Sequence, residues 1–161
     1  MRTIGITGTS SGWTPGQEKS FRLWLRKLKE RGIDTFRGGD CVGVDKQAHE
    51  IAVELGLRTI GHPPVNPRAR AFCKYDEELP LKPYLERNHD IVNNSDIMIA
   101  CPSSFKWFPH SGTWATITYS RKRKPLLIIY PDGTVETINW IRKCSTEEDT
   151  LTMFLEGTNL E

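Results

Sequence analysis

The chain has 161 residues, a length that suits one domain with a buried core. Its 22 Lys and Arg residues against 20 Asp and Glu residues give a net charge of +2, so the whole-molecule charge does not indicate a nucleic-acid or membrane surface. No apolar run approaches membrane-spanning length and the N-terminus lacks a signal-peptide pattern, so we expect a cytoplasmic protein that does not associate with membranes.

The cysteines and histidines give no pattern of a bound metal. The four cysteines lie far apart without a C-x-x-C pair, and the four histidines lack the spacing of metal ligands. We therefore expect reduced thiols, and we predict neither a metal site nor a resident cofactor.

The first part of the chain alternates short apolar runs with amphipathic stretches. TIGIT, residues 3–7, is β-branched and ends at Gly8, which is typical of a buried strand. A helix is predicted over residues 15–31, because Pro15 stands near its first turn and Gly32 follows its end. The alternation continues with a strand at 33–40, a helix at 44–56 and a strand at 57–64.

A long charged loop separates this part from the next. Residues 63–82 are rich in Pro and Arg without a clear period, and a loop of that length is usually functional or mobile. The alternation then resumes with a helix at 83–95, a strand at 96–100, a helix at 112–124 and a strand at 125–130. Residues 134–143 fit either an edge strand or a short helix, and no element is assigned to the tail.

Strands separated by single helices predict an α/β protein. The expected fold is a Rossmann-like three-layer sandwich with a mostly parallel sheet, in which ligands bind beyond the carboxyl ends of the strands. The loops expected at those ends are all rich in glycine or small hydroxyl residues: GTSSGW, RGGDCVGVD, CPSSFKWFPHSGT and PDG. Each could be an ordinary turn, but together they predict a site for a phosphate or a carboxylate.

The start of the predicted helix at 112 is the clearest part of this site. Ser111, Gly112 and Thr113 would present backbone N–H groups and hydroxyls to an anionic ligand. The alternative is an ordinary N-cap made by Ser111. Several aromatic residues near these loops could stack on a nucleobase, although the last of them suits the core equally well: Trp13, Phe105, Trp107 and Trp114.

Three further features have structural and functional interpretations. The basic run RKRK at 121–124 has two interpretations. It is more typical of a helix end whose positive charges complement the helix dipole than of a nucleic-acid-binding patch. Arg68 and Arg70 could close over a phosphate or simply be solvated loop residues. His49 is more often a surface residue than a general base.

Four segments together resemble the SLOG superfamily, which joins the DNA-processing protein A group to the LOG nucleotide phosphoribohydrolases. These segments are GITGTSSGW, FRGGDCVGVDKQAHEIA, ERNHDIVNNSDIMIACP and SGTWATITYSRKRKPLLIIYPDG. The resemblance implies a single SLOG-like nucleotide-binding domain over 1–161, with its core at 3–133 and a C-terminal extension at 134–161. It also implies self-association. The G-G-x-x-x-G-x-D pattern and the Arg87-Asn88 pair are similar to motifs of the DNA-processing group.

One departure from the LOG pattern concerns catalysis. LOG enzymes carry P-G-G-x-G-T-x-x-E, whereas PHSGTWAT places Thr116 where the glutamate would stand. A threonine cannot act as a carboxylate base at neutral pH, so whether the protein is an enzyme is left open. Asp40, Asp45 and Glu86 are the candidate replacement carboxylates.

These observations predict a protein that senses, carries or sequesters a phosphorylated nucleotide-derived small molecule. The alternatives are a nucleotide N-glycosidase and, disfavoured by the near-neutral charge, a single-stranded DNA-binding protein. The residues predicted to contact the ligand are Gly8, Thr9, Ser10, Trp13, Gly38, Gly39, Asp40, Gly43, Asp45, Arg87, Asn88, Pro102, Ser103, Ser111, Gly112 and Thr113.

Overall fold

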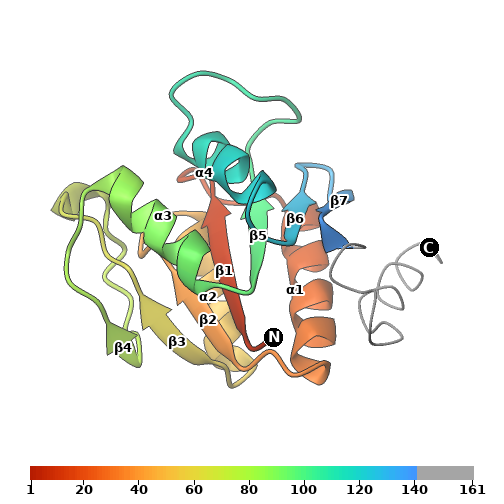
Figure 1. The fold of residues 1–161 in the computed structure, drawn as a ribbon, viewed down its shortest axis with the longest axis horizontal. Helices are drawn as coiled ribbons and strands as arrows, with labels where there is room; N and C mark the ends of the chain where they lie inside the picture. Colours follow the sequence, from red (N-terminus) through yellow and green to blue (C-terminus); the bar gives the residue numbers. More distant parts are fainter. Residues whose placement is uncertain (141–161) are drawn as a thin grey trace.

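Residues 1–140 are described by a computed structural model, in which the apolar runs of the sequence form the centre of one sheet (Figure 1). The seven strands lie in the order β4-β3-β2-β1-β5-β6-β7. Their bounds are β1 Thr3–Gly8, β2 Thr35–Gly38, β3 Arg58–Gly61, β4 Glu77–Glu78, β5 Ile97–Cys101, β6 Leu126–Ile129 and β7 Val135–Ile138. All neighbouring pairs are parallel except β6 and β7, which confirms the mostly parallel sheet.

The central strands are buried on both faces. Every residue of β5, IMIAC, and of β6, LLII, is buried, as expected for parallel strands covered by helices on either side. The outer strands are more exposed: β4 has two exposed glutamates, and β7 is half-buried throughout. The core therefore lies around β1, β5 and β6.

Two pairs of helices cover the two faces of the sheet (Figure 1). Their bounds are α1 Pro15–Glu30, α2 Val44–Glu54, α3 Tyr84–Asn94 and α4 Gly112–Arg121. Side chains of α1 and α2 pack in one cluster with Ile4, Ile97 and Leu127. Side chains of α3 and α4 pack in a second cluster with Met98 and Leu126. This arrangement is the three-layer sandwich that the sequence predicts.

The helix starts follow from local side-chain chemistry. Thr14 accepts a hydrogen bond from the Gln17 N–H (3.1 Å), and the Gln17 side chain accepts one from the Thr14 N–H (3.0 Å), which is a capping box before α1. Ser111 caps α4 by accepting a hydrogen bond from the Trp114 N–H (3.1 Å). The ordinary N-cap considered for Ser111 is therefore present.

The regions without a firm assignment from sequence have definite structures up to residue 140. The long loop at 63–82 contains a 3-10 turn, Pro67–Ala69, and the short strand β4, which extends the sheet beyond β3. Residues 135–138 form an edge strand, one of the two alternatives for the segment 134–143. The rest of the predicted C-terminal extension, 141–161, lies outside the described residues.

The strand order places a topological switch point at β1. The connection from β1 through α1 leads to β2 on one side, whereas β5 pairs with β1 on the other side. Connections that diverge in this way leave a crevice at the carboxyl ends of the strands, which is the usual ligand site of such folds. Within residues 1–140 there is no helix long and apolar enough to cross a membrane, and no cluster of metal-ligating side chains.

A buried glutamine joins the carboxyl ends of the neighbouring strands β5 and β6 and provides a test of the fold. Gln17 Nε2 donates to the carbonyl oxygens of Pro102 (2.8 Å) and Ile129 (2.9 Å), just beyond β5 and at the end of β6. Gln17→Leu leaves both carbonyls buried without a donor, so we expect it to lower the free energy of unfolding by about 2–4 kcal/mol in urea titrations. Lys19→Gln, on the exposed side of the same turn, should change it by less than about 0.5 kcal/mol. Equal stability of the two variants would contradict the role of Gln17.

Candidate functional site

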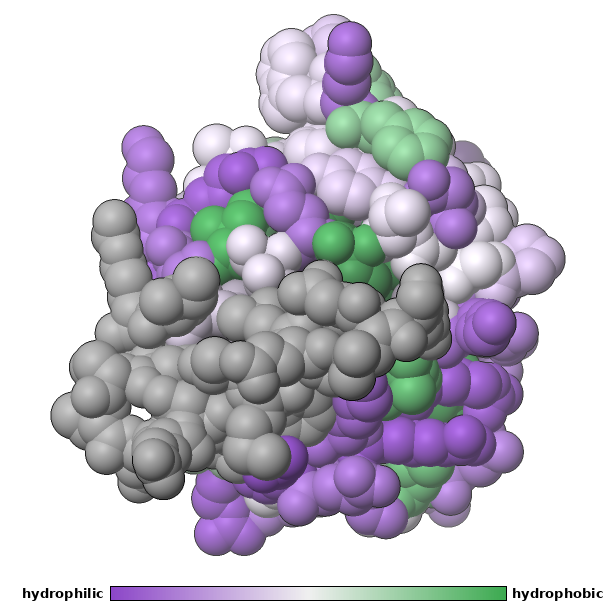
Figure 2. Space-filling view, turned by 90° about the vertical axis from the view of Figure 1, so that its right-hand side faces the viewer, coloured by the Kyte–Doolittle hydropathy of each residue, from purple (hydrophilic) through white to green (hydrophobic). Residues whose placement is uncertain are grey.

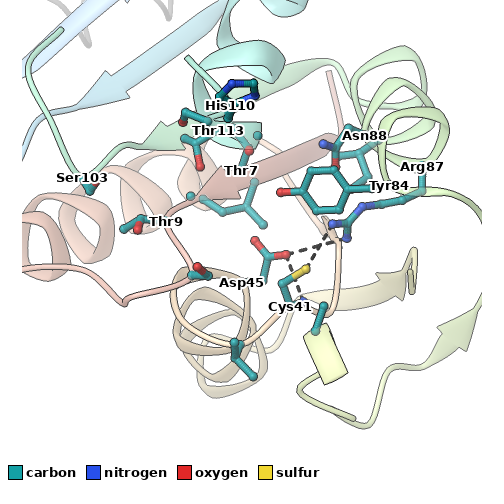
Figure 3. A pocket seen from close by; sticks show the side chains of 18 of the residues that line it. Thr7, Thr9, Cys41, Asp45, Tyr84, Arg87, Asn88, Ser103, His110 and Thr113 are labelled. Atoms are coloured by element: carbon teal, nitrogen blue, oxygen red, sulfur yellow. Dashed lines mark hydrogen bonds and ion pairs between the residues drawn. The ribbon is translucent and has the colours of Figure 1, made fainter. Parts of the chain in front are cut away.

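A cavity of about 480 Å³ opens at the carboxyl ends of β1 and β5, between the starts of α2, α3 and α4 (Figure 3). Its wall combines hydroxyl, apolar and charged side chains from segments far apart in the sequence. The lining residues are Ile6, Thr7, Gly8, Thr9, Ser10, Cys41, Val42, Asp45, Ala69, Tyr84, Arg87, Asn88, Ile91, Ser103, Phe108, His110, Ser111, Gly112 and Thr113. The volume is in the range of sites for small organic ligands.

The start of α4 supplies hydrogen-bond donors to one side of the cavity. Gly112 and Thr113 are the first two residues of this helix, and N–H groups at such positions have no acceptor within their own helix. The partial positive charge of the helix start adds to their attraction for an anion. The hydroxyls of Thr7, Ser103 and Thr113 also lie in the wall, and none has a hydrogen-bond partner within residues 1–140.

The absence of a side chain at residue 112 fixes the spacing between α3 and α4. A Cβ atom at Gly112 would collide with the hydroxyl and ring of Tyr84, the first residue of α3. The Tyr84 ring can therefore lie directly against the start of α4, at the mouth of the cavity. Phe108, from the loop before α4, is the second aromatic residue in the wall.

The Arg87 guanidinium is buried beneath the cavity and ties α3 to the loop after β2. Arg87 is 2% exposed and donates hydrogen bonds from Nη1 to the carbonyl oxygens of Gly39 and His62, the latter at 3.3 Å. Its Nη2 donates to the sulfur of Cys41 at 3.1 Å, and the Tyr84 ring covers its Cζ at 4.7 Å. A Cβ at Gly39 would collide with this guanidinium. Most donors of Arg87 are thus used to hold protein segments together.

Asp45 brings a negative charge into the same wall from the first turn of α2. Its Oδ2 accepts a hydrogen bond from the Cys41 N–H (3.1 Å) and lies 4.0 Å from Arg87 Nη1 (Figure 3). Burial raises the pKa of Asp45 from 3.8 to about 6, and the attraction of Arg87 only partly offsets this. The Cys41 thiol beside it has a raised pKa, also because of burial, and is neutral near pH 7.

A second buried carboxylate fixes the long loop instead of facing the cavity. Asp40 is fully buried; its Oδ2 accepts from Arg70 Nε (2.8 Å) and its Oδ1 accepts from the Cys73 N–H (2.9 Å). Arg70 also donates to Glu78, and the Val42 N–H donates to the Ala69 oxygen (3.1 Å). Arg70 is therefore committed within the protein, and it is Ala69 of this loop that reaches the cavity wall.

The structure brings together most of the residues that the sequence marks as ligand-binding. Those that line the cavity are Gly8, Thr9, Ser10, Asp45, Arg87, Asn88, Ser103, Ser111, Gly112 and Thr113. Those outside its wall are Trp13, Gly38, Gly39, Asp40, Gly43 and Pro102. Gly39 and Asp40 nevertheless hold the wall in place through Arg87 and Arg70. The PDG turn lies outside as well, since Gly133 contacts Gly16 at the start of α1.

The candidate catalytic residues separate in the same way. Asp45 lines the cavity, whereas Asp40 lies behind the wall and Glu86 is exposed near Lys82 (3.8 Å). Thr116, at the position of the LOG glutamate, is buried and donates its hydroxyl to the Gly112 oxygen (2.9 Å). It does not line the cavity.

The aromatic residues singled out from the sequence mostly serve other purposes. Trp13 packs against Phe21 with ring centroids 5.1 Å apart, and Trp114 is buried in the core. Phe105 stacks on Tyr130, and Trp107 is 62% exposed on the loop that projects above the sheet, seen in profile at the top of Figure 2. None of these four lines the cavity.

Several lining residues had no signal in the sequence. Tyr84 and His110 flank predicted helix starts, and Cys41 lies inside the glycine-rich loop, so proximity to those motifs could have suggested them. Ile6, Thr7 and Ile91 belong to core elements and gave no such indication. His49, considered as a general base, is buried against Tyr75, with ring centroids 4.3 Å apart, and lies outside this cavity.

Comparison with known proteins supports the fold. Neither a family model nor a curated protein matches the chain. Among solved structures, the molybdenum cofactor binding protein of the phototrophic bacterium Rippkaea orientalis is 25% identical, with a TM-score of 0.62 over 80% of this chain and 76% of that chain. Two structures of the molybdenum cofactor carrier protein of Chlamydomonas reinhardtii also match. One has a TM-score of 0.58 at 19% identity over 99% of this chain and 96% of that chain. The other has 0.53 at 20% identity over 79% and 75%.

These matches confirm the LOG/SLOG-type Rossmann-like fold that the sequence motifs implied, over most of the chain. Two of the matched proteins, one bacterial and one algal, are molybdenum cofactor binding or carrier proteins. Self-association, which the resemblance also implied, stays a prediction.

The role of Arg87 as a tie between segments predicts a large loss of stability on its removal. Arg87→Met leaves the Gly39 and His62 carbonyls and the Asp45 carboxylate buried without their partner. We expect the free energy of unfolding to fall by about 3–5 kcal/mol in urea titrations. Arg26→Met, on the exposed face of α1, is the matched control and should change it by less than about 0.5 kcal/mol. A stable Arg87→Met protein would show that Arg87 is not needed to hold these segments.

The raised pKa of Asp45 predicts a dependence of stability on pH. A carboxyl whose pKa is higher in the folded than in the unfolded protein destabilises the fold once it ionises, so this effect is absent below pH 3.8 and complete above about pH 6. Asp45→Asn retains an acceptor for the Cys41 N–H and removes the charge. We expect it to be more stable than the parent at pH 7.5 by about 2–3 kcal/mol, and nearly equal to it at pH 4.

Urea titrations from pH 4 to 8 measure this difference directly. Glu50→Gln removes the same charge from an exposed position of the same helix and should show no comparable trend. If Asp45→Asn were less stable than the parent at pH 7.5, the attraction between Asp45 and Arg87 would outweigh the penalty of burial.

Proposed function

We propose that this protein binds a phosphorylated, nucleotide-derived small molecule in the cavity beyond β1 and β5, and that it carries or sequesters this molecule without converting it. The observation that carries the proposal is the start of α4, where the N–H groups of Gly112 and Thr113 lie in the wall of a cavity at the topological switch point. A phosphate there would accept hydrogen bonds from these groups and from nearby hydroxyls.

The rest of the wall suits a planar organic group attached to that phosphate. Tyr84 and Phe108 are both partly exposed at the cavity mouth and offer aromatic faces to a flat ring. Ile6, Val42 and Ile91 add apolar surface to the same wall. A wall that combines donors for a phosphate with aromatic and apolar surface is the composition expected for a nucleotide or a related phosphorylated heterocycle.

The names of the matched proteins point to the same class of ligand. The molybdenum cofactor, which two of them bind or carry, is a nucleotide-derived ligand. At 25% identity or less, the likeness does not transfer that ligand to this chain by itself. It supports the proposal because the cavity wall combines a helix start with aromatic side chains, which suits a phosphorylated nucleotide-derived molecule.

Binding without conversion is favoured by the absence of the LOG glutamate. Thr116 stands in its place, is buried and does not face the cavity. One observation favours hydrolysis of an N-glycosidic bond as the second candidate function: among the described residues that line the cavity, Asp45 is a carboxylate with a pKa of about 6, a value suited to acid–base work. Single-stranded DNA binding gains no support, because most donors of the lining residue Arg87 are used within the protein.

Gly112→Ala tests the proposed phosphate site. The new methyl group collides with the hydroxyl and ring of Tyr84, which must leave its place against the start of α4. We expect the affinity for nucleoside monophosphates, measured by calorimetric titration, to fall at least tenfold, which is about 1.4 kcal/mol. Ala115→Ser, at an exposed position of the same helix, should bind as the parent does.

The same titrations include inorganic phosphate, AMP and GMP as probes, each checked by the rise in melting temperature that ligand binding must cause. Absence of binding by every phosphorylated probe would refute the proposed function. Chromatography of the mixtures after long incubation separates the two candidates, since a binding protein returns intact nucleotide and a hydrolase releases free base.

A further inference from the structure

Asp45 is an unusual residue in the wall of an anion site, because a carboxylate repels a phosphate. Its side chain is 8% exposed, and the residue lines the cavity at the start of α2. Oδ2 accepts from the Cys41 N–H, and the Cys41 thiol is the other donor within residues 1–140 that reaches the carboxylate. The carboxylate therefore has accepting capacity left over, at a position apart from the N–H groups of α4 (Figure 3).

A purely structural role for Asp45 would be to balance the charge of Arg87, but the contact between the two side chains does not fully explain its position. The 4.0 Å between Asp45 Oδ2 and Arg87 Nη1 is too long for a hydrogen bond, and Nη1 and Nη2 of Arg87 already donate to backbone oxygens and to the Cys41 sulfur. Arg87 Nε has no partner at all within the described part of the chain. A pair arranged to stabilise the fold would make the bidentate contact that these two side chains lack.

The position of Asp45 also penalises the folded protein. Burial raises its pKa to about 6, so at neutral pH Asp45 is ionised although burial destabilises the ionised form. Buried carboxylates with this property gather at functional sites, where the charge meets a ligand instead of a structural partner. An unsatisfied acceptor in a ligand cavity calls for a ligand that brings hydrogen-bond donors.

We propose that Asp45 determines which heterocycle the cavity accepts, and that the ligand carries the 2-amino-4-oxopyrimidine ring that guanine contains. This inference rests on the proposed function and names its ligand class. In that ring, a ring N–H and the neighbouring amino group form a pair of adjacent donors, which matches the paired acceptors of a carboxylate. Adenine offers a donor beside an acceptor along its corresponding edge, so one of its lone pairs would face an oxygen of Asp45.

The two ends of the cavity then have separate tasks. The N–H groups of Gly112 and Thr113 hold the phosphate, and Asp45 at the start of α2 holds the donor edge of the ring. Tyr84 and Phe108 at the mouth supply aromatic faces that do not distinguish one ring from another. Asp45 therefore determines the selectivity between purines. A ring without two adjacent donors would leave the buried carboxylate unpaired, which lowers the affinity for that ring.

Among the groups that adjoin Asp45, the carboxylate itself is the one whose charge changes between pH 5 and 8. A histidine, His110, also lines the cavity, but it stands just before α4 at the phosphate end, so its charge bears on the phosphate that GMP and AMP share. Arg87 remains a cation, and burial raises the pKa values of the neighbouring thiols and phenols so that they stay neutral in this range. These neighbours are Cys41, Cys101, Tyr75 and Tyr84, with Asp40 held by Arg70 behind the wall.

Asp45→Asn tests the inference by exchanging two acceptors for one acceptor and one donor. Calorimetric titration of GMP and AMP at pH 8 should show that the parent prefers GMP by at least tenfold. Because an amide matches the donor–acceptor edge of adenine, Asp45→Asn should lose this preference or reverse it. Glu50→Gln removes the same charge from the exposed face of α2 and should keep the parent's preference.

The ratio of the two affinities provides a second measurement on the unaltered protein. GMP and AMP share the same ribose phosphate, so titration of the phosphate cancels in the ratio. As the pH falls from 8 to 5, the Asp45 carboxyl gains a proton and becomes a donor itself, so the preference for GMP should shrink several-fold. In Asp45→Asn the ratio of the two affinities should not change with pH. The pH series on the parent protein tests the inference by itself, even if Asp45→Asn does not fold.

The outcomes separate this inference from the proposed function. If both nucleotides bind the parent equally well, or if the preference survives in Asp45→Asn and is independent of pH, the assignment of Asp45 is wrong while the proposed function stands. If neither nucleotide binds, the proposed function falls and the inference falls with it.

Discussion

The buried guanidinium of Arg87 is the contact on which the arrangement of the site depends. It lies between α3 and two loops that follow β2 and β3, and it donates to the backbone of both. Loops at the carboxyl ends of parallel strands lack the backbone hydrogen bonds of the sheet, so their conformation depends on hydrogen bonds from side chains such as Arg87. Gly39 lacks a side chain where the guanidinium passes, which lets the tie form. Arg70 and Asp40 extend the same principle to the long loop.

The cavity that results is asymmetric in charge. Backbone donors and hydroxyls gather at the start of α4, whereas the carboxylate of Asp45 stands at the start of α2. A helix start favours anions, and the one on α2 is already neutralised by the chain's own carboxylate. A ligand with a phosphate at one end and donors at the other would match this distribution, and its orientation would be fixed by charge before any apolar contact forms.

Aromatic residues illustrate where sequence reasoning about the site failed. Trp13 was expected to stack on a base because it stands next to a glycine-rich motif, whereas Trp114 was left open between stacking and the core. Both contribute to core packing, where a large apolar ring is most stable. Tyr84 and Phe108 reach the cavity mouth because α3 and α4 meet there at Gly112. Their position follows from helix packing, which adjacency in the sequence does not report.

The sequence by itself determined the order and type of the four helices and of strands β1, β2, β3, β5 and β6, because apolar periodicity and turn residues act locally. It did not predict β4, and it left β7 open between a strand and a helix. It also identified all four loops correctly as parts of one edge, since parallel strands place their carboxyl ends together, although only three of them supply residues to the cavity wall. Only the tertiary structure decided which carboxylate faces the cavity. Asp40 and Asp45 lie five residues apart in one glycine-rich stretch, yet one is enclosed by Arg70 and the other opens to the ligand space. That difference depends on how the long loop and α3 cross the stretch, and contacts between segments so distant in the chain leave no local pattern to read.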